Sequence, residues 1–370
     1  MIGRLKKSKS SVPNLVIAQR VVDKMADAAK HFLQDETGEA MVGLIVHGAH
    51  TGVDTLYVLD TIAPDENAVV REWATFQQGD ERQDELIYWL QENWHVQRHK
   101  KRDAQGKPVS AKWDVPLRYL GDWHKQPGFM VAPSGGDLMT ARGWIDDKDN
   151  GMDFLLAPIV TLGHPATVTG ESGGNFIAVS QGDDTAMRVD FWYIDRHSRD
   201  FHPINPSVYP DDQLPTVAAY PWHLVNEARF KAESELLEKD GLFTTLVLWD
   251  TGNAPPLDVC FLTARIGADK VLLLITPYNY PTQAPQARVA PFKGIKPDED
   301  IYKVFGELWK HSEPVKDPSD WKWSEGRHLL DYIFALEESL GIKHTPPLIS
   351  TDGASTSQPT KAEPAPEEKS

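Results

Sequence analysis

The sequence of 370 residues predicts a mixed α/β, or α+β, fold in two domains. Three observations support this prediction. Strand-like and helix-like segments alternate over about the first 180 residues, a proline-rich stretch then interrupts the pattern, and a second set of helices and strands follows. A chain of this length also exceeds what one ordinary hydrophobic core accommodates.

The first predicted domain, residues 14–196, follows a basic segment (1–13) that we expect to be disordered. Helical spacing of apolar residues predicts helices over residues 14–34, 81–99 and 134–144. Short apolar runs with β-branched residues, bounded by turn residues, predict strands. These strands cover residues 40–46, 55–62, 68–76, 117–123, 154–162, 176–181 and 187–194.

Residues 197–220 contain several prolines without sustained periodicity and predict a linker. A second domain is predicted over residues 221–345. Its expected order is a helix (222–239), three strands (243–249, 257–264 and 270–276), a proline-rich turn and two helices (300–310 and 326–340). The tail, residues 346–370, is almost without apolar residues and is expected to be disordered.

The composition restricts the classes of function. Against 38 lysine and arginine residues stand 54 aspartate and glutamate residues, so the formal net charge is −16. Such a surface repels phosphate backbones and disfavours nucleic-acid binding. No apolar run reaches the roughly 20 residues that span a bilayer, and no signal-peptide pattern is present. We therefore expect a cytoplasmic protein without a membrane partner. The single cysteine, Cys260, excludes an internal disulfide and cysteine-rich zinc sites.

The most informative segment runs from Tyr119 to Leu138. An apolar strand delivers His124 at its end, a glycine- and proline-containing loop follows, and Ser134 and Asp137 stand where the next helix begins. A sheet can bring such side chains together around a metal ion. Zinc accepts imidazole nitrogen and carboxylate oxygen and keeps one position open for water in catalytic sites. A nearby carboxylate must then accept the proton of that water.

These residues resemble the motif of the JAMM (MPN+) metalloproteases of the prokaryotic JAB type, H-x-H-x(7)-S-x(2)-D with an upstream glutamate. The matching stretches are ETGEAMVG from Glu36, WHKQP from Trp123 and PSGGD from Pro133. The resemblance implies a Zn²⁺ cofactor held by His124 and Asp137, with Ser134 donating a hydrogen bond to the oxyanion. It implies Glu36 as general base, with Glu39 as the alternative.

One position departs from this pattern, because Gln126 stands where the family has its second histidine. An amide oxygen is a weaker zinc ligand than imidazole. Three interpretations remain open. Gln126 or a water completes the metal site, another histidine does so (His47, His95 or His99), or the domain is a non-catalytic relative.

Each of these residues also has an ordinary structural interpretation. Ser134 and Asp137 have the spacing of a helix capping box. His124 is also explained as a strand-end histidine, and Glu36 as part of a solvated turn. The joint occurrence of the residues in a strand-then-helix context favours the family over coincidence.

The second domain has a resemblance of its own. The stretch TPYNYPTQAP, which contains Tyr280, Pro281 and Pro285, resembles the strand-turn of the ubiquitin-conjugating (UBC) and RWD-like fold. These three residues are candidate binding residues, although prolines at such spacings enforce a sharp loop in any family. A conjugating enzyme carries its thioester on a cysteine after this turn. Here Cys260 precedes the turn within an apolar strand, so a buried, inert thiol and a non-catalytic domain are expected.

Together these features predict a bacterial-type zinc-dependent isopeptidase or peptidase. Its partner would be a ubiquitin-like protein, its precursor or its conjugates, together with activating or conjugating enzymes of the same system. The alternative is a catalytically inactive JAMM-fold adaptor in such a system. A third hypothesis is a metal-free structural protein in which the motifs are coincidental.

Overall fold

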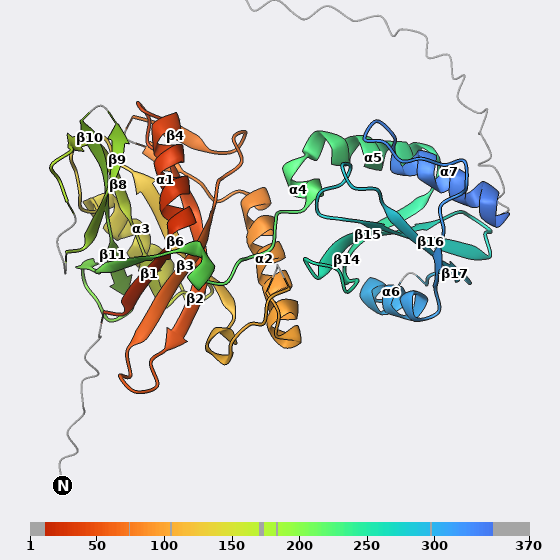
Figure 1. The fold of residues 1–370 in the computed structure, drawn as a ribbon, viewed down its shortest axis with the longest axis horizontal. Coiled ribbons are helices and arrows are strands. Elements are labelled where there is room, and N and C mark those ends of the chain that lie inside the picture. The colour runs from red at the N-terminus through yellow and green to blue at the C-terminus, as the bar shows by residue number, and fades with distance from the viewer. Residues whose placement is uncertain are drawn as a thin grey trace, which may run out of the picture.

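The computed structural model describes residues 12–73, 75–103, 106–169, 174–182, 184–296 and 298–342. Residues 1–11 and 346–370, which belong to the segments expected to be disordered, lie outside this range. The chain forms two lobes that both combine helices and sheets (Figure 1). The predicted mixed α+β class is confirmed.

An eight-stranded mixed sheet forms the centre of the N-terminal lobe. Its spatial order is β13-β1-β3-β2-β6-β8-β10-β9. The strands are β1 (Asn14–Ala18), β2 (Gly38–His47), β3 (Asp54–Ile62), β6 (Leu117–Lys125), β8 (Ile159–Pro165), β9 (Phe176–Gly182), β10 (Thr185–Asp190) and β13 (Pro206–Tyr209). β6 lies in the middle of the order, and this strand carries His124.

Three helices accompany this sheet. α1 (Gln19–His31) packs its buried side chains, including Val22 and Met25, against the sheet. α3 (Gly135–Asp146) packs beside β7 (Phe154–Leu156) through Ala141 and Ile145. α2 (Glu81–Lys100) lies on the side of this lobe that faces the C-terminal lobe (Figure 1).

The beginning of the chain corrects the sequence prediction. Residues 14–18 were expected to start a helix but form β1, which pairs in parallel with both β3 and β13. The run Leu15-Val16-Ile17 is buried, and continuous apolar runs rich in β-branched residues are typical of strands covered on both faces. Helix α1 begins only at Gln19.

Several other expected elements are divided. In place of the expected strand 68–76 there are two short paired strands, β4 (Val70–Glu72) and β5 (Thr75–Gln77). The expected strand 154–162 breaks before Pro158, so β7 joins a separate small sheet with β11 (Trp192–Asp195) and β12 (His202–Pro203). The expected strand 187–194 is divided in the same way, because β10 belongs to the large sheet and β11 to the small one. The predicted linker 197–220 contains β12 and β13, and β13 extends the large sheet.

The C-terminal lobe is built on a five-stranded antiparallel sheet. Its strands are β14 (Phe243–Asp250), β15 (Leu257–Ala264), β16 (Lys270–Thr276), β17 (Gln286–Pro291) and β18 (Glu313–Val315). The expected helix 222–239 is interrupted at Asn226, whose side chain accepts a hydrogen bond from the Arg229 backbone N–H and so starts a new helix. The two parts are α4 (Trp222–Val225) and α5 (Glu227–Lys239).

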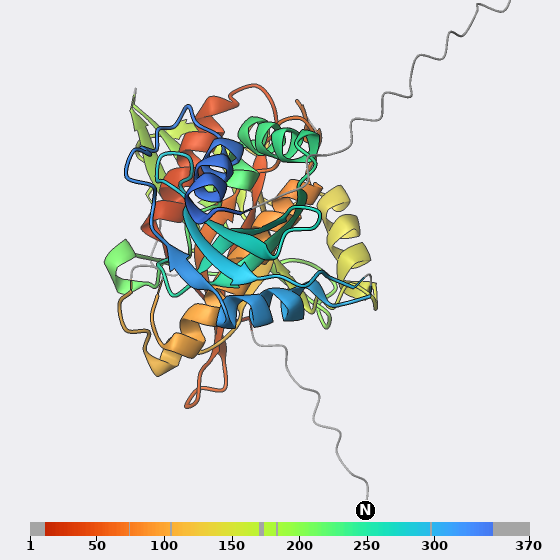
Figure 2. The ribbon, with the colours of Figure 1, turned by 90° about the vertical axis from the view of Figure 1, so that its right-hand side faces the viewer.

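The helices of this lobe cover both faces of its sheet. Figure 2 shows α5 and α7 (Leu329–Leu340) on one side and α6 (Ile301–Lys310) on the other. Alternation along β15 explains the two cores. Val259 and Phe261 belong to the core that includes α7, and Cys260 packs in the core with Phe305 of α6.

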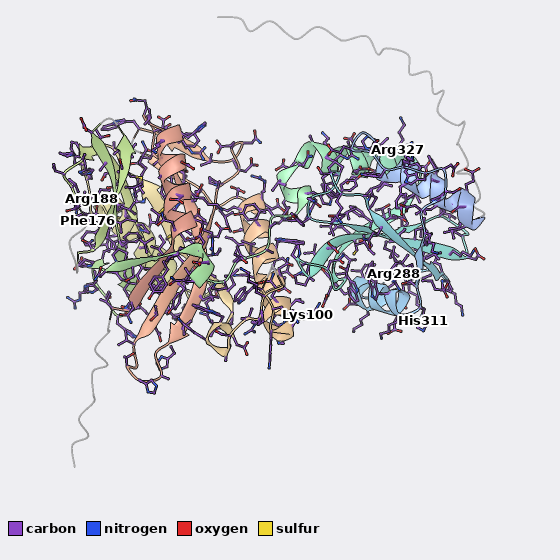
Figure 3. All side chains as sticks on the ribbon, viewed as in Figure 1. Lys100, Phe176, Arg188, Arg288, His311 and Arg327 are labelled. Carbon is purple, nitrogen blue, oxygen red and sulfur yellow. The ribbon has the colours of Figure 1, made fainter. Side chains whose placement is uncertain are left out.

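The two lobes share contacts through α2. The buried Asn93 side-chain oxygen accepts a hydrogen bond from the Leu257 backbone N–H at 3.2 Å. At the end of the helix, Lys100 forms an ion pair with Asp250, and Figure 3 shows Lys100 at the boundary of the lobes. In the described part of the chain, no helix has the length and apolar character needed to cross a bilayer.

Candidate functional site

Strand pairing brings the upstream glutamate to the end of β6. β6 and β2 are antiparallel, and His124 stands opposite Gly38, two residues beyond Glu36. A side chain at position 38 would meet the Trp123 carbonyl oxygen at 2.1 Å and the Phe76 ring at 2.7 Å. Only glycine therefore allows this close approach, which sets Glu36 beside His124.

The beginning of α3 supplies the third residue. The His124 Nε2 and Asp137 Oδ1 atoms are 3.7 Å apart. The Ser134 backbone N–H donates to Asp137 Oδ2 at 2.6 Å, and the Asp137 backbone N–H donates to Ser134 Oγ at 3.2 Å. The capping box predicted from the sequence is therefore confirmed. It fixes one carboxylate oxygen of Asp137 and turns the other toward His124.

A cavity of about 470 Å³ opens over these residues. Glu36, His124 and Asp137 all line it, so the structure brings together the three side chains that the motif predicted. Two further features complete the cavity. Its aromatic wall includes Phe76, Trp144 and Phe201, and its remaining polar lining includes Gln78 and Asp122. Ser134 does not line the cavity, but its backbone N–H holds the Asp137 carboxylate that does.

Burial and neighbouring charges shift the pKa values of Glu36 and His124. Burial, and then the negative charge of Asp137, raise the pKa of Glu36 to about 7, partly offset by Lys125. Burial lowers the pKa of His124, partly offset by Asp137. At neutral pH the imidazole is therefore neutral and keeps a lone pair, while Glu36 is close to the midpoint of its titration.

Asp122 is a cavity residue that the motif did not point to. Burial raises the pKa of Asp122 to about 6, and the neighbouring Tyr119 hydroxyl and Gln78 amide lower it. Gly121 just before it has a φ of +128°, and a side chain there would meet the Leu156 carbonyl oxygen at 2.1 Å. The period of two along a strand places residues 122 and 124 on one face, and this signal was available in the sequence.

Gln126 contacts the cluster through its amide group. Its Nε2 donates a hydrogen bond to Asp137 Oδ2 at 3.3 Å, and its Oε1 is buried without a hydrogen-bond partner. The residue is only 5% exposed. Gln126 thus touches the Asp137 carboxylate from the position where the motif has its second histidine.

No other histidine of those considered replaces the missing one. His47 lies at the opposite end of β2 from Gly38 and pairs with Asp54 at 2.7 Å. His95 and His99 are exposed on α2, with their rings 4.2 Å apart. Within the described ranges, no group of three or more histidine, cysteine, aspartate or glutamate side chains is arranged to hold a metal ion.

Glu39, the alternative base, is not part of the cluster. It lies beside Lys24 of α1, Thr61 and Trp123, and it does not line the cavity. Successive residues of a strand face opposite sides of the sheet, so the Glu39 side chain lies on the face opposite to that of position 38. The structure therefore separates Glu39 from His124.

His124 and Asp137 can supply two ligands to one zinc ion. Zinc–nitrogen and zinc–oxygen bonds are about 2.0–2.2 Å long, so two atoms on one ion lie within about 4.2 Å of each other. The 3.7 Å between His124 Nε2 and Asp137 Oδ1 satisfies this limit. The unpartnered Oε1 of Gln126 is a neutral amide oxygen, which is a weaker type of zinc ligand than imidazole.

The three candidate binding residues of the C-terminal lobe stand in a turn that packs against its interior. Tyr280 is 2% exposed and packs against Trp222 and Trp323, and Pro285 is buried. The Pro281 carbonyl oxygen accepts a hydrogen bond from the Trp323 indole at 2.8 Å. The turn therefore packs into the core through Tyr280 and Pro285, Pro281 is half-buried, and a binding role for these residues stays a prediction. Cys260 is fully buried, as expected, and burial raises its pKa.

No protein-family model matches this sequence, and no curated protein matches it. One solved structure with similarity to part of the chain is the solution structure of protein DSY2949 from Desulfitobacterium hafniense. The sequence identity is 10% and the TM-score 0.31, and the match covers 53% of this chain and 93% of that chain. This similarity is too low to support an argument about fold or function.

Proposed function

We propose that the protein is a zinc-dependent isopeptidase or peptidase of the JAMM type. Its substrate would be a ubiquitin-like modifier, the precursor of one, or its conjugates, in the cytoplasm. The observation that carries the proposal is the convergence of Glu36, His124 and Asp137 on one cavity, with a glutamate pKa of about 7. The motif resemblance supports the same assignment.

The side chains have separate tasks in this proposal. His124 and Asp137 would hold the zinc ion, with Gln126 at a third position. When bound, zinc polarises a carbonyl and makes a water nucleophilic near neutral pH. Glu36 accepts the proton of the attacking water and later returns it to the leaving amine. Ser134 holds Asp137 in position through the capping box.

The cavity also favours an extended peptide as substrate. Glu36 is held next to the β4–β5 hairpin, because its backbone N–H donates to the Glu72 carbonyl at 2.8 Å. Phe76 and Gln77 of β5 line the cavity. A peptide that lies along this strand gains main-chain hydrogen bonds, and glycines in it let the backbone approach the reacting groups closely.

The C-terminal lobe would bind or position a partner without chemistry of its own. Its only cysteine is buried in β15 and is not available for a thioester. The partners proposed are the ubiquitin-like protein and activating or conjugating enzymes of its system. A nucleic-acid partner is disfavoured by the net charge of −16.

One observation favours a second candidate, an inactive adaptor with the same partners. The Gln126 amide group donates to Asp137, and this amide, a weaker zinc ligand than imidazole, stands where the motif has its second histidine. Fewer protein ligands lower zinc affinity and with it the supply of activated water.

The two candidates are separated by zinc content and cleavage measured together. The purified chain is analysed for zinc and incubated with a linear ubiquitin-like fusion, alongside Glu36→Ala and Gln126→His variants. The hydrolase proposal predicts cleavage by the unmodified chain and none by Glu36→Ala. Cleavage that is found only in Gln126→His would instead establish the adaptor.

A further inference from the structure

A second cavity lies between the two lobes, and we call it the inter-lobe cavity. It has a volume of about 660 Å³. Trp89 of α2, Phe230 of α5 and Leu246 and Leu248 of β14 give it an apolar floor. Both lobes contribute, because α2 belongs to the N-terminal lobe and α5 and β14 to the C-terminal lobe (Figure 1). Its size is within the range of roughly 300–1,000 Å³ that is typical of ligand sites.

The rim of the inter-lobe cavity carries unbalanced negative charge. Glu81 and Glu85 lie one helical turn apart on α2 and are exposed. In the part of the chain that the structure describes, no lysine, arginine or histidine lies within ion-pair distance of either. Arg82 also lines the cavity, but it pairs with Glu227 at 3.3 Å and donates to the Leu224 carbonyl. Burial, and then the charge of Glu81, raise the pKa of Glu85.

Two tyrosines from different lobes line the same cavity. Tyr88 of α2 is 53% exposed and Tyr302 of α6 is 50% exposed. Half-exposed aromatic rings beside carboxylates are well suited to a cation, because the ring face attracts positive charge and covers an aliphatic stem. The adjoining His223 does not oppose a cation, because burial lowers its pKa to about 4.

The inter-lobe cavity adjoins the candidate site. Gln78 lines the candidate site, and Asp80, two residues further on, lines the inter-lobe cavity. The Gln83 amide group donates to Gln78 Oε1 at 3.2 Å, and the Gln83 backbone N–H donates to Asp80 at 2.7 Å. One short stretch of chain therefore separates the two cavities.

From this geometry we propose that the inter-lobe cavity binds a lysine- or arginine-bearing segment of a partner protein. The cation lies between Glu81 and Glu85, its stem lies against Tyr88 and Tyr302, and a neighbouring apolar side chain rests on the floor. This binding does not depend on hydrolysis, because none of these residues lines the candidate site.

The test measures peptide binding to the full chain by fluorescence anisotropy. The probe is a fluorescein-labelled hexapeptide, Gly-Leu-Lys-Arg-Leu-Gly, and its control has glutamates in place of the two basic residues. The variant Glu81→Gln/Glu85→Gln removes the rim charge. The matched control is Asp23→Asn/Asp27→Asn, which removes two exposed carboxylates with the same spacing from α1.

We expect saturable binding of the basic peptide and none of the acidic one. Two exposed ion pairs lost together should weaken binding roughly five-fold in Glu81→Gln/Glu85→Gln, with little change in the α1 control. Tyr302→Ala, checked for an unchanged thermal midpoint, should weaken binding as well. The proposal is overturned by equal weakening in both double variants, by full affinity in Tyr302→Ala, or by absence of saturable binding.

Discussion

At the scale of single residues, buried carboxyl groups define the character of the candidate site. Asp122 has a pKa of about 6 in the folded chain, above its ordinary value of 3.8. The folded state therefore binds this proton more tightly than the unfolded state. The resulting stabilisation is present below pH 4 and is lost as the pH rises through about 6.

The variant Asp122→Asn tests this linkage. In the unmodified chain, ionisation of Asp122 should lower the free energy of unfolding by up to about 3 kcal/mol between pH 4 and pH 7, at about 1.4 kcal/mol for each pKa unit. The neutral amide of Asp122→Asn cannot ionise, so this decrease should be absent from the variant. Urea unfolding at both pH values measures the difference. Asp23→Asn, an exposed change of equal charge, should leave the decrease intact. An Asp122→Asn protein that keeps the full decrease would show that Asp122 is ionised when folded.

A second residue-scale prediction concerns Gly38. Gly38→Ala should lower the free energy of unfolding by more than about 2 kcal/mol, because its Cβ would meet the Trp123 carbonyl oxygen and the Phe76 ring. The control is Gly143→Ala in α3, where an added Cβ would contact nothing beyond the helix's own backbone. That change should stabilise the helix by about 0.5–1 kcal/mol. Equal stability of the two variants would mean that β2 and β6 do not approach so closely.

At the scale of elements, strong periodic patterns predicted the structure well. The strand ending at His124 and the helix beginning after Ser134 follow directly from an apolar run and a capping signal. This order made a meeting of His124 and Asp137 possible, and the motif resemblance was needed to predict it. Asp122 could have been found from the alternation along β6, which places it on the face of His124. Gln78 follows the β4–β5 hairpin, and the sequence held no signal that this hairpin lies beside His124.

Elements whose identity depends on distant partners were predicted less well. The segment 14–18 has helical spacing when read with α1, yet its strand partners come from β3 and β13. Residues 154–162 read as one strand, but the pairing of β7 with β11 divides them. Sheet pairing overrides local propensity in both cases.

Helix α5 carries a buried charge whose removal should be costly. Glu233 is 0% exposed and accepts hydrogen bonds from Arg229 at 2.7 Å, from the Leu329 backbone N–H at 2.9 Å and from the Tyr280 hydroxyl. Glu233→Gln leaves Arg229 without its anion and should destabilise the chain by about 3 kcal/mol. Urea unfolding measures this loss.

Glu235→Gln, on the exposed side of the same helix, serves as the comparison. Its weak pair with Lys231 at 3.9 Å should contribute less than about 0.5 kcal/mol. A Glu233→Gln protein as stable as Glu235→Gln would contradict the role assigned to this network.

At the scale of the whole molecule, α2 couples the lobes. Asn93 is 0% exposed and provides the acceptor for the Leu257 backbone N–H. Asn93→Ala leaves that donor unpaired and should cost about 1–3 kcal/mol. Differential scanning calorimetry should then show the single transition broadening or dividing in two. Lys100→Ala, which removes only a partly exposed ion pair, should change stability by less than about 1 kcal/mol. A larger loss in Lys100→Ala than in Asn93→Ala would contradict this coupling.

The proposed role of Glu36 in hydrolysis is tested most directly by the rate of cleavage of a ubiquitin-like fusion in the presence of zinc. Without metal the pKa of Glu36 is about 7, and a bound zinc ion would lower it, so the rate of the unmodified chain should rise with pH below about 7 as Glu36 ionises. Glu36→Gln should lose at least about 100-fold in rate, because general-base catalysis contributes roughly 10²–10⁴-fold. Glu39→Gln, on the other face of the sheet, should stay within a few-fold of the unmodified chain. An unmodified chain that does not cleave the fusion, or a Glu36→Gln chain that cleaves it at an unchanged rate, would contradict the proposed function.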